Sequence, residues 1–259
     1  MSTPASLKQR VQTAARVGLE RLGLQRRADQ LLDLEPAFWD LYARCSPYTM
    51  TTQERMYAVY QAAGHVARAG IAGDYVECGV WRGGSSMMAA LSLARAGDPD
   101  RPLWLYDTFE GMAEPTAQDA ANALEGADVQ EEWRRHDAGG HNDWCYAPLD
   151  EVRANMRSAG VTEERLRLVK GKVEETIPGS VPDRIALLRL DTDWYASTKH
   201  ELEHLYPRLE PGGVLIIDDY GHWPGARQAV DEYLAEHGIS LLLGRIDYSG
   251  RIAVKPGAA

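Results

Sequence analysis

The 259-residue sequence predicts an α/β fold with a doubly wound, mostly parallel sheet and one antiparallel edge strand. Short apolar runs alternate with segments of helical periodicity along most of the chain. Two of these runs, 185–190 and 214–217, are too continuously apolar for strands with one wet face, so they predict central strands covered on both sides. The last segments, 240–246 and 251–254, flank a short turn and predict a closing β-hairpin.

The first 70 residues predict an N-terminal helical arm. Basic residues from Lys8 to Arg27 are mixed with apolar ones, which favours an amphipathic helix over a targeting peptide. Residues 35–69 continue at helical spacing and are interrupted at Pro47, which predicts two or three helices with a loop at 46–52.

The main domain, 71–259, begins with strand 75–78, a glycine turn and helix 85–96. Strand 103–106 follows and leads into a loop at 108–111. Segment 115–148 has no sustained period but contains several aromatic and histidine residues, so we expect it to form a lid together with the N-terminal helices. The other expected elements are helices 149–158, 197–209 and 226–237 and a strand at 166–169.

The composition excludes several classes of partner. A formal net charge of −10, without a cluster of Lys and Arg in the folded part, disfavours nucleic acid. No apolar run approaches the roughly 20 residues that span a bilayer, so no membrane is expected. Cys45, Cys78 and Cys145 are odd in number and widely spaced, so they predict buried free thiols in a reducing compartment, the cytoplasm.

The motif YVECGVWRGGSS, residues 75–86, predicts a turn that binds a cofactor. Glu77 lies at the strand end, and the glycines after it let the backbone turn sharply into a helix whose first amides are free for a ligand. A dinucleotide fold would need the spacing GxGxxG for its pyrophosphate, so this spacing suits a nucleoside cofactor without phosphate. An ordinary glycine-containing turn is the alternative.

Asp107 ends the next strand, where an acid can accept hydrogen bonds from both ribose hydroxyls of a cofactor. Its interval from Glu77 suits one βαβ unit. The alternative is that Asp107 only caps the loop 108–111.

Three aspartates follow the two central strands. Asp191 ends 185–190, and Asp218 and Asp219 end 214–217, so all three are expected at the carboxyl edge of the sheet, where open α/β sheets bind ligands. Clustered carboxylates without a counterion repel one another strongly, so a hard divalent cation is the expected occupant, and Mg²⁺ fits. Nearby Asp193 is expected to be a bystander that caps a helix or faces solvent.

With these residues the chain resembles the macrocin O-methyltransferase family and its mycinamicin and novobiocin sugar methyltransferase relatives. The resemblance extends from about Tyr48 to Val254 and includes YTMTTQERMYAVY, YVECGVWRGGSS, LYDTFEGM, VKGKVEETIP, LLRLDTDWY, GVLIIDDYG and RIDYSGRIAVK. It implies a Rossmann-like class I methyltransferase fold that uses S-adenosylmethionine and Mg²⁺ to methylate a sugar hydroxyl of a natural product, as in antibiotic biosynthesis. It also implies a homo-oligomer, a dimer or larger.

The resemblance implies a role for each matching residue. Asp191 corresponds to a metal ligand and the general base, and Asp218 and Asp219 correspond to the other metal carboxylates. The residues expected to bind S-adenosylmethionine are Thr49, Met50, Glu77, Cys78, Gly79, Val80, Trp81, Asp107, Thr108, Phe109, Glu110, Gly111, Lys172 and Val173. The arm before Ser46 and segment 115–148 depart from the family, so the identity of the acceptor does not transfer.

Several alternatives stay open from the sequence. The alternative general bases are three loop histidines, His136, His141 and His222. The aromatic residues that could stack on an acceptor ring or on adenine are Trp144, Tyr146 and Trp194. A catechol-type phenolic O-methyltransferase would need the same metal and is an alternative enzyme. An NAD-dependent oxidoreductase is disfavoured because this sequence lacks the glycines that bind pyrophosphate. A non-catalytic small-molecule-binding protein is disfavoured because it would not need all three aspartates.

Overall fold

The computed structural model describes residues 34–119 and 128–257. The amphipathic helix expected between Lys8 and Arg27 lies outside the described residues, and so does part of segment 115–148. The chain divides after Asp40, and the sheet and the site described below belong to the unit that begins at Leu41. The domain boundary expected at residue 70 stays a prediction.

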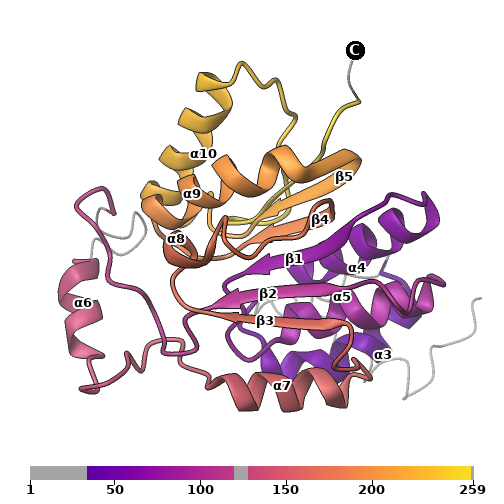
Figure 1. Cartoon of the computed structure of the whole chain (residues 1–259), viewed down its shortest axis with the longest axis horizontal. Helices are drawn as coiled ribbons and strands as arrows, with labels where there is room; N and C mark the ends of the chain where they lie inside the picture. Colours follow the sequence, from indigo (N-terminus) through magenta and orange to yellow (C-terminus); the bar gives the residue numbers. More distant parts are fainter. Residues whose placement is uncertain (1–33, 120–127, 258–259) are drawn as a thin grey trace, which may run out of the picture. The chain divides into compact units, whose positions relative to one another are not determined.

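Seven strands form one sheet in the order β3-β2-β1-β4-β5-β7-β6. Figure 1 shows the first five of these strands in this order. Strands β1 to β5 run parallel, β7 pairs antiparallel with β5, and β6 pairs antiparallel with β7. The strands are β1 (Asp74–Cys78), β2 (Leu103–Asp107), β3 (Leu166–Lys170), β4 (Ile185–Leu190), β5 (Leu209–Ile217), β6 (Gly244–Arg245) and β7 (Arg251–Val254). The predicted sheet with an antiparallel edge is therefore confirmed.

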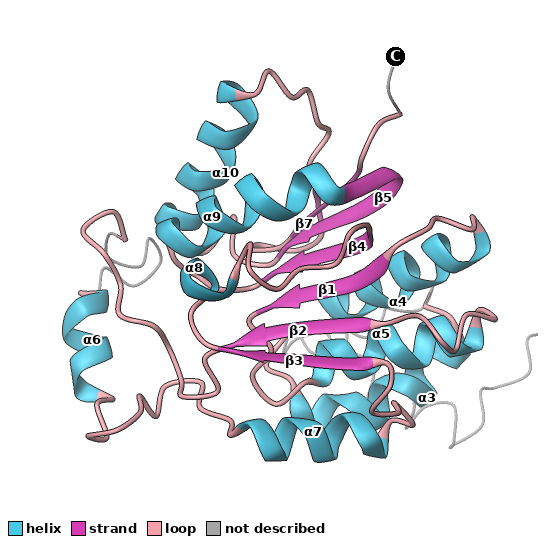
Figure 2. Ribbon diagram, viewed as in Figure 1, coloured by secondary structure: helices cyan, strands magenta, loops and turns pink. Residues whose placement is uncertain are grey.

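Helices cover both faces of this sheet (Figure 2), with α4, α5 and α7 on one face and α8, α9 and α10 on the other. The helices are α3 (Pro36–Cys45), α4 (Gln53–Arg68), α5 (Gly84–Arg95), α6 (Val129–Arg135), α7 (Leu149–Ser158), α8 (Val173–Thr176), α9 (Tyr195–Leu205) and α10 (Pro224–Glu236), with 3₁₀ turns at Ser46–Tyr48 and Tyr206–Arg208. Within the described ranges, no helix combines the length and the apolar character needed to cross a membrane.

Strand β4 lies between β1 and β5, and all six of its residues are buried. Its Leu188 belongs to a core cluster that also includes Leu202 of α9, Leu215 of β5 and Val230 of α10. Each fully buried leucine contributes roughly 1.5–3 kcal/mol relative to an exposed one, so this cluster holds β4 and β5 firmly side by side. The prediction of a central strand at 185–190 is confirmed.

Some element boundaries differ from the sequence predictions. Helix α9 ends at Leu205 instead of residue 209, because Pro207 has no amide hydrogen to donate within a helix. The strand expected at 240–246 shrinks to Gly244–Arg245, since it lies at the sheet edge and pairs only with β7 over these two residues. Segment 115–148, expected to be irregular, contains the short helix α6.

Replacing Leu188 with alanine tests the central position of β4. Leu188 is 0% exposed, so we expect Leu188→Ala to lower the free energy of unfolding by about 2–5 kcal/mol, measured by urea denaturation. Leu242 is 90% exposed and provides the matched control, for which Leu242→Ala should change stability by less than about 0.5 kcal/mol. Equal effects of the two changes would contradict the described core.

Candidate functional site

The carboxyl ends of β1, β2, β4 and β5 border one pocket. The loops that follow these strands supply much of its lining, and the turn between β6 and β7 and residues 48–51 before α4 supply other parts. Ligands of open α/β sheets bind at this edge, so this pocket is the candidate functional site.

Most of the residues predicted from the sequence line this pocket. They are Thr49, Met50, Gly79, Val80, Trp81, Asp107, Thr108, Gly111, Lys172, Val173, Asp191, Asp218 and Asp219. Four predicted cofactor residues are not part of the lining: Glu77, Cys78 and Phe109 are buried, and Glu110 is exposed, 2.7 Å from the ammonium of Lys170. A role for these four in cofactor binding stays a prediction.

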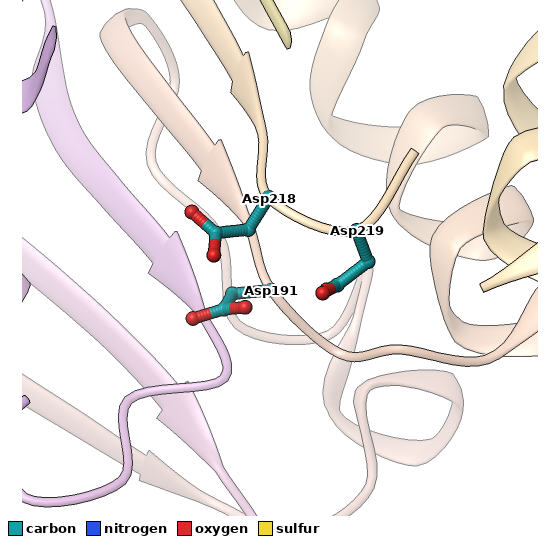
Figure 3. Close-up of side chains that lie close together, drawn as sticks. All are labelled: Asp191, Asp218 and Asp219. Carbon is teal, nitrogen blue, oxygen red and sulfur yellow. The ribbon is translucent and has the colours of Figure 1, made fainter. Parts of the chain in front are cut away.

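Asp191, Asp218 and Asp219 extend toward one another from the ends of β4 and β5 (Figure 3). One carboxylate oxygen of each lies within 4.8 Å of the others. Leu190 of β4 pairs in register with Ile217 of β5, which makes the aspartates that follow them neighbours. Asp218 and Asp219 are buried, whereas the side chain of Asp191 is 27% exposed.

These three carboxylates fit a divalent cation. Oδ2 of Asp219 is buried and, among the described residues, has no hydrogen-bond partner. Burial raises the pKa of Asp191 and of Asp219 well above the usual range, and the neighbouring carboxylates raise both further. A hard cation that prefers carboxylate oxygens, such as Mg²⁺, would satisfy the buried oxygen and offset the repulsion.

Two arginines that the sequence predictions missed contact the same carboxylates. Nη2 of Arg189 lies 2.8 Å from Oδ2 of Asp191 and 2.6 Å from Oδ1 of Asp218. Arg55 pairs through Nη1 with Asp218 and through Nε, at 3.0 Å, with Asp247. These arginines offset part of the repulsion between the carboxylates, although two guanidinium groups do not balance all the carboxylates around them. The sequence signal that could have identified Arg189 is the presence of a charged residue within an otherwise apolar strand.

Asp193, expected to be a bystander, lines the same pocket. It is half-buried, and its carboxylate accepts a 2.6 Å hydrogen bond from Nε1 of Trp223. Burial raises its pKa to about 7. Asp193 is not the cap of α9, because the N-cap of that helix is Trp194. The structure therefore does not support either form of the bystander expectation, a helix cap or a solvent-facing side chain.

The glycine turn and the Asp107 loop are held by close backbone contacts. Gly79 has φ +81°, and a Cβ at this position would lie 1.8 Å from the carbonyl oxygen of Asp191. The Asp107 carboxylate accepts hydrogen bonds from the amides of Val80, Trp81 and Phe109 at 2.7, 3.0 and 2.7 Å. Asp107 thus fixes the turn after β1 and its own loop, while its predicted contact with a ribose stays a prediction.

Of the three candidate histidines, His222 lines the pocket and the other two do not. His136 lies 2.5 Å from Asp143 and 3.3 Å from Glu132 through its two ring nitrogens. The ring of His141 packs against that of Tyr146, with centroids 4.3 Å apart. Neither histidine is therefore placed to act on a ligand in this pocket.

Three tryptophans cluster beside the aspartates. Trp144 and Trp223 line the pocket, and Trp194 is buried with its ring centroid 6.1 and 4.9 Å from theirs. Tyr146 lies outside the lining. Trp144 and Trp223 are thus the members of this cluster that can contact a ligand.

The cysteines are free thiols, as predicted. Cys45 and Cys78 are buried, but Cys145 is only half-buried and lines the pocket. Burial raises its pKa to about 12, so it stays a neutral thiol near pH 7.

Sequence comparison identifies a matching family and similar proteins. The sequence model of the Macrocin-O-methyltransferase (TylF) family matches residues 39–254. The chain is 40% identical over 203 residues to the 8-demethyl-8-(2,3-dimethoxy-alpha-L-rhamnosyl)-tetracenomycin-C 4'-O-methyltransferase of Streptomyces olivaceus, covering 78% of this chain and 74% of that protein. It is 35% identical over 205 residues to the mycinamicin III 3''-O-methyltransferase of Micromonospora griseorubida, covering 78% and 76%.

Solved structures with the same fold include two methyltransferases. The O-methyltransferase NovP superposes with a TM-score of 0.70 at 32% identity, covering 81% of this chain and 83% of that one. The calicheamicin methyltransferase CalS11 superposes with a TM-score of 0.56 at 19% identity, covering 91% and 92%, and this likeness shows the fold alone.

A methyl group at Gly79 tests the close approach between the turn and the Asp191 strand end. Gly79→Ala should lower the free energy of unfolding by about 1–2 kcal/mol from the positive φ alone, and further from the clash with the backbone. Gly139 has a similar φ of +77°, and no atom lies within 4 Å of the position that an added methyl group would take, so Gly139→Ala isolates the backbone contribution. Urea denaturation that gives equal losses for the two variants would show that the approach is not tight.

Proposed function

The chain belongs to the macrocin O-methyltransferase (TylF) family, and on that premise we propose that it transfers a methyl group from S-adenosylmethionine to a sugar hydroxyl of a glycosylated natural product. We propose Asp191, Asp218 and Asp219 as the ligands of a Mg²⁺ that the reaction requires. The observation that supports this most directly is the convergence of these three carboxylates in the pocket that the predicted cofactor residues also line.

The methyl donor is proposed to bind along four segments of the lining. They are residues 49–50 before α4, 79–81 after β1, 107, 108 and 111 at and after the end of β2, and 172–173 after β3. These segments and the aspartates border one pocket, so donor and acceptor would meet in a single enclosure, which makes their reaction effectively unimolecular.

A sugar ring is the proposed acceptor because of two observations. The Streptomyces olivaceus relative is named for a rhamnosyl compound. In this chain, Trp144 and Trp223 offer apolar ring surface in the same pocket as the carboxylates, so that one side of an acceptor can pack on aromatic carbon while its hydroxyls face oxygen ligands.

Asp191 is the proposed general base. Its carboxylate is the most accessible of the three, whereas Asp218 and Asp219 are buried. Bound Mg²⁺ would lower the pKa of a coordinated hydroxyl, and S-adenosylmethionine would supply the methyl group. Asp191 would take the hydroxyl proton, and the close packing of Gly79 against the Asp191 carbonyl would keep that strand end fixed beside the turn.

Two further expectations belong to this proposal. Assembly into a dimer or larger oligomer rests on the family resemblance, and a cytoplasmic location rests on the three cysteines, which predict a reducing compartment. The lid role of segment 115–148 has one structural support, because its residues Trp144 and Cys145 line the pocket.

Asp191→Asn tests the assignment of the base. We expect the rate of S-adenosylhomocysteine formation to fall by a factor of about 100–10,000, the usual contribution of a general base, with S-adenosylmethionine affinity changed less than about twofold by calorimetry. Asp183 is an exposed aspartate just before the opposite end of β4, so Asp183→Asn is the matched control and should retain full activity. An active Asp191→Asn enzyme would refute the base assignment.

Metal removal tests the Mg²⁺ requirement. Enzyme treated with EDTA should lose turnover on a panel of rhamnosides, and added Mg²⁺ should restore it, because the buried carboxylates require a cation to hold the acceptor oxygen. Chelated enzyme that works at full speed would contradict the metal, and turnover of catechols in place of glycosides would contradict the proposed acceptor.

A further inference from the structure

Glu77 and Arg189 form a buried ion pair across two neighbouring strands. They are register partners on β1 and β4, and Nη1 of Arg189 lies 2.5 Å from Oε1 of Glu77. Both side chains are 1% exposed. Burial of an ion pair is costly unless further hydrogen bonds satisfy both partners, so the groups around this pair determine what it does.

Two hydroxyl groups, of Tyr75 and Ser86, hold the carboxylate of Glu77. Its Oε2 accepts a 2.6 Å hydrogen bond from the hydroxyl of Tyr75 and another from the hydroxyl of Ser86 on α5. The carboxylate of Glu77 contacts Arg189 and these hydroxyls, and Glu77 does not line the pocket.

Arg189 connects Glu77 to the candidate metal centre. The guanidinium that contacts Glu77 through Nη1 uses Nη2 for Asp191 and Asp218, at 2.8 and 2.6 Å. The same Nη2 lies 3.4 Å from the hydroxyl of Thr51. One planar cation is thus shared between a carboxylate outside the pocket and two carboxylates inside it.

We propose that Glu77 is a positioning residue of the metal centre, acting through Arg189, and that it does not bind S-adenosylmethionine. The inference rests on the proposed metal site. The negative charge of Glu77 offsets the charge of Arg189, which would otherwise compete with a bound cation for Asp191 and Asp218. Buried charges at these distances interact strongly because little water screens them.

The sign of the effect follows from the charges. Neutralising Glu77 leaves the guanidinium of Arg189 without one of its counterions, which strengthens its hold on Asp191 and Asp218 and repels a second cation. Metal affinity should therefore fall, whereas the affinity for a cofactor that Glu77 does not touch should stay unchanged. Groups that orient metal ligands typically change metal affinity 10–100-fold when altered.

The test compares the binding of Mn²⁺ and the binding of S-adenosylhomocysteine in the full-length protein carrying Glu77→Gln. Mn²⁺ binding, followed by the electron paramagnetic resonance signal of free Mn²⁺, should weaken by about tenfold or more. Binding of S-adenosylhomocysteine, followed by calorimetry, should change less than twofold. This ligand is chosen because its sulfur is neutral and does not respond to the altered charge.

Two variants serve as matched controls. Tyr75→Phe removes a hydrogen bond to Glu77 but retains the carboxylate, so it should leave Mn²⁺ affinity within about threefold and exclude a general effect of altering this buried group. Asp107→Asn should show the reverse split, with weaker S-adenosylhomocysteine binding and unchanged Mn²⁺ binding. Thermal unfolding of each variant reports whether the fold persists.

The outcomes separate this inference from the proposed function. Weaker S-adenosylhomocysteine binding by Glu77→Gln with unchanged Mn²⁺ affinity would overturn the inference and restore Glu77 as a cofactor residue. Equal losses of both affinities together with a lowered melting temperature would also overturn it. Failure of the unaltered protein to bind Mn²⁺ would instead refute the metal of the proposed function, and the inference with it.

If Glu77→Gln does not fold, Arg189→Lys tests the same connection between Glu77 and the aspartates by altering the arginine instead of the glutamate. A lysine ammonium cannot bridge Glu77 and both aspartates as the planar guanidinium does, so it competes less with a bound cation for Asp191 and Asp218. Mn²⁺ affinity should therefore rise by about tenfold with unchanged S-adenosylhomocysteine binding. Unchanged or lower Mn²⁺ affinity in a folded Arg189→Lys protein would overturn the inference.

Discussion

Buried charges at the carboxyl edge of the sheet are the constraint on which the rest of the site depends. Asp191, Asp218 and Asp219 converge there, and Arg55 and Arg189 offset part of their repulsion. Because these groups are largely removed from water, each one changes the electrostatic environment of the others. The arrangement is stable only if strands β4 and β5 keep their register, which the apolar cluster around Leu188 provides.

The surrounding loops are fixed to this charged centre by backbone contacts. Gly79 packs against the carbonyl of Asp191, and Asp107 binds amides of two loops at once. Asp247 accepts hydrogen bonds from the amides of Ser249 and Gly250 at 2.9 and 2.7 Å, and it also pairs with Arg55. The loops after β1 and β2, the turn between β6 and β7 and the carboxylates are therefore parts of one preorganised unit, which suits a reaction that depends on precise alignment.

Much of the fold was predictable because local patterns report local structure. Helix 149–158 and strand 185–190 have the predicted boundaries, since periodicity and burial leave a direct trace in the sequence. The predicted boundaries were wrong where pairing with another strand sets the length of an element, as at the edge strand Gly244–Arg245, which is limited by its pairing with β7. The three aspartates were predictable because the ends of parallel strands meet at one edge.

The sequence by itself determined the order and type of most elements, the family and the place of the aspartates, because each follows from residues close together along the chain. Only the tertiary structure decided which charges pair with one another. Glu77 and Arg189 are 112 positions apart, and their contact arises from the register of β1 against β4. No local pattern contains that register, so the sequence did not predict that Glu77 pairs with an arginine that also contacts Asp191 and Asp218.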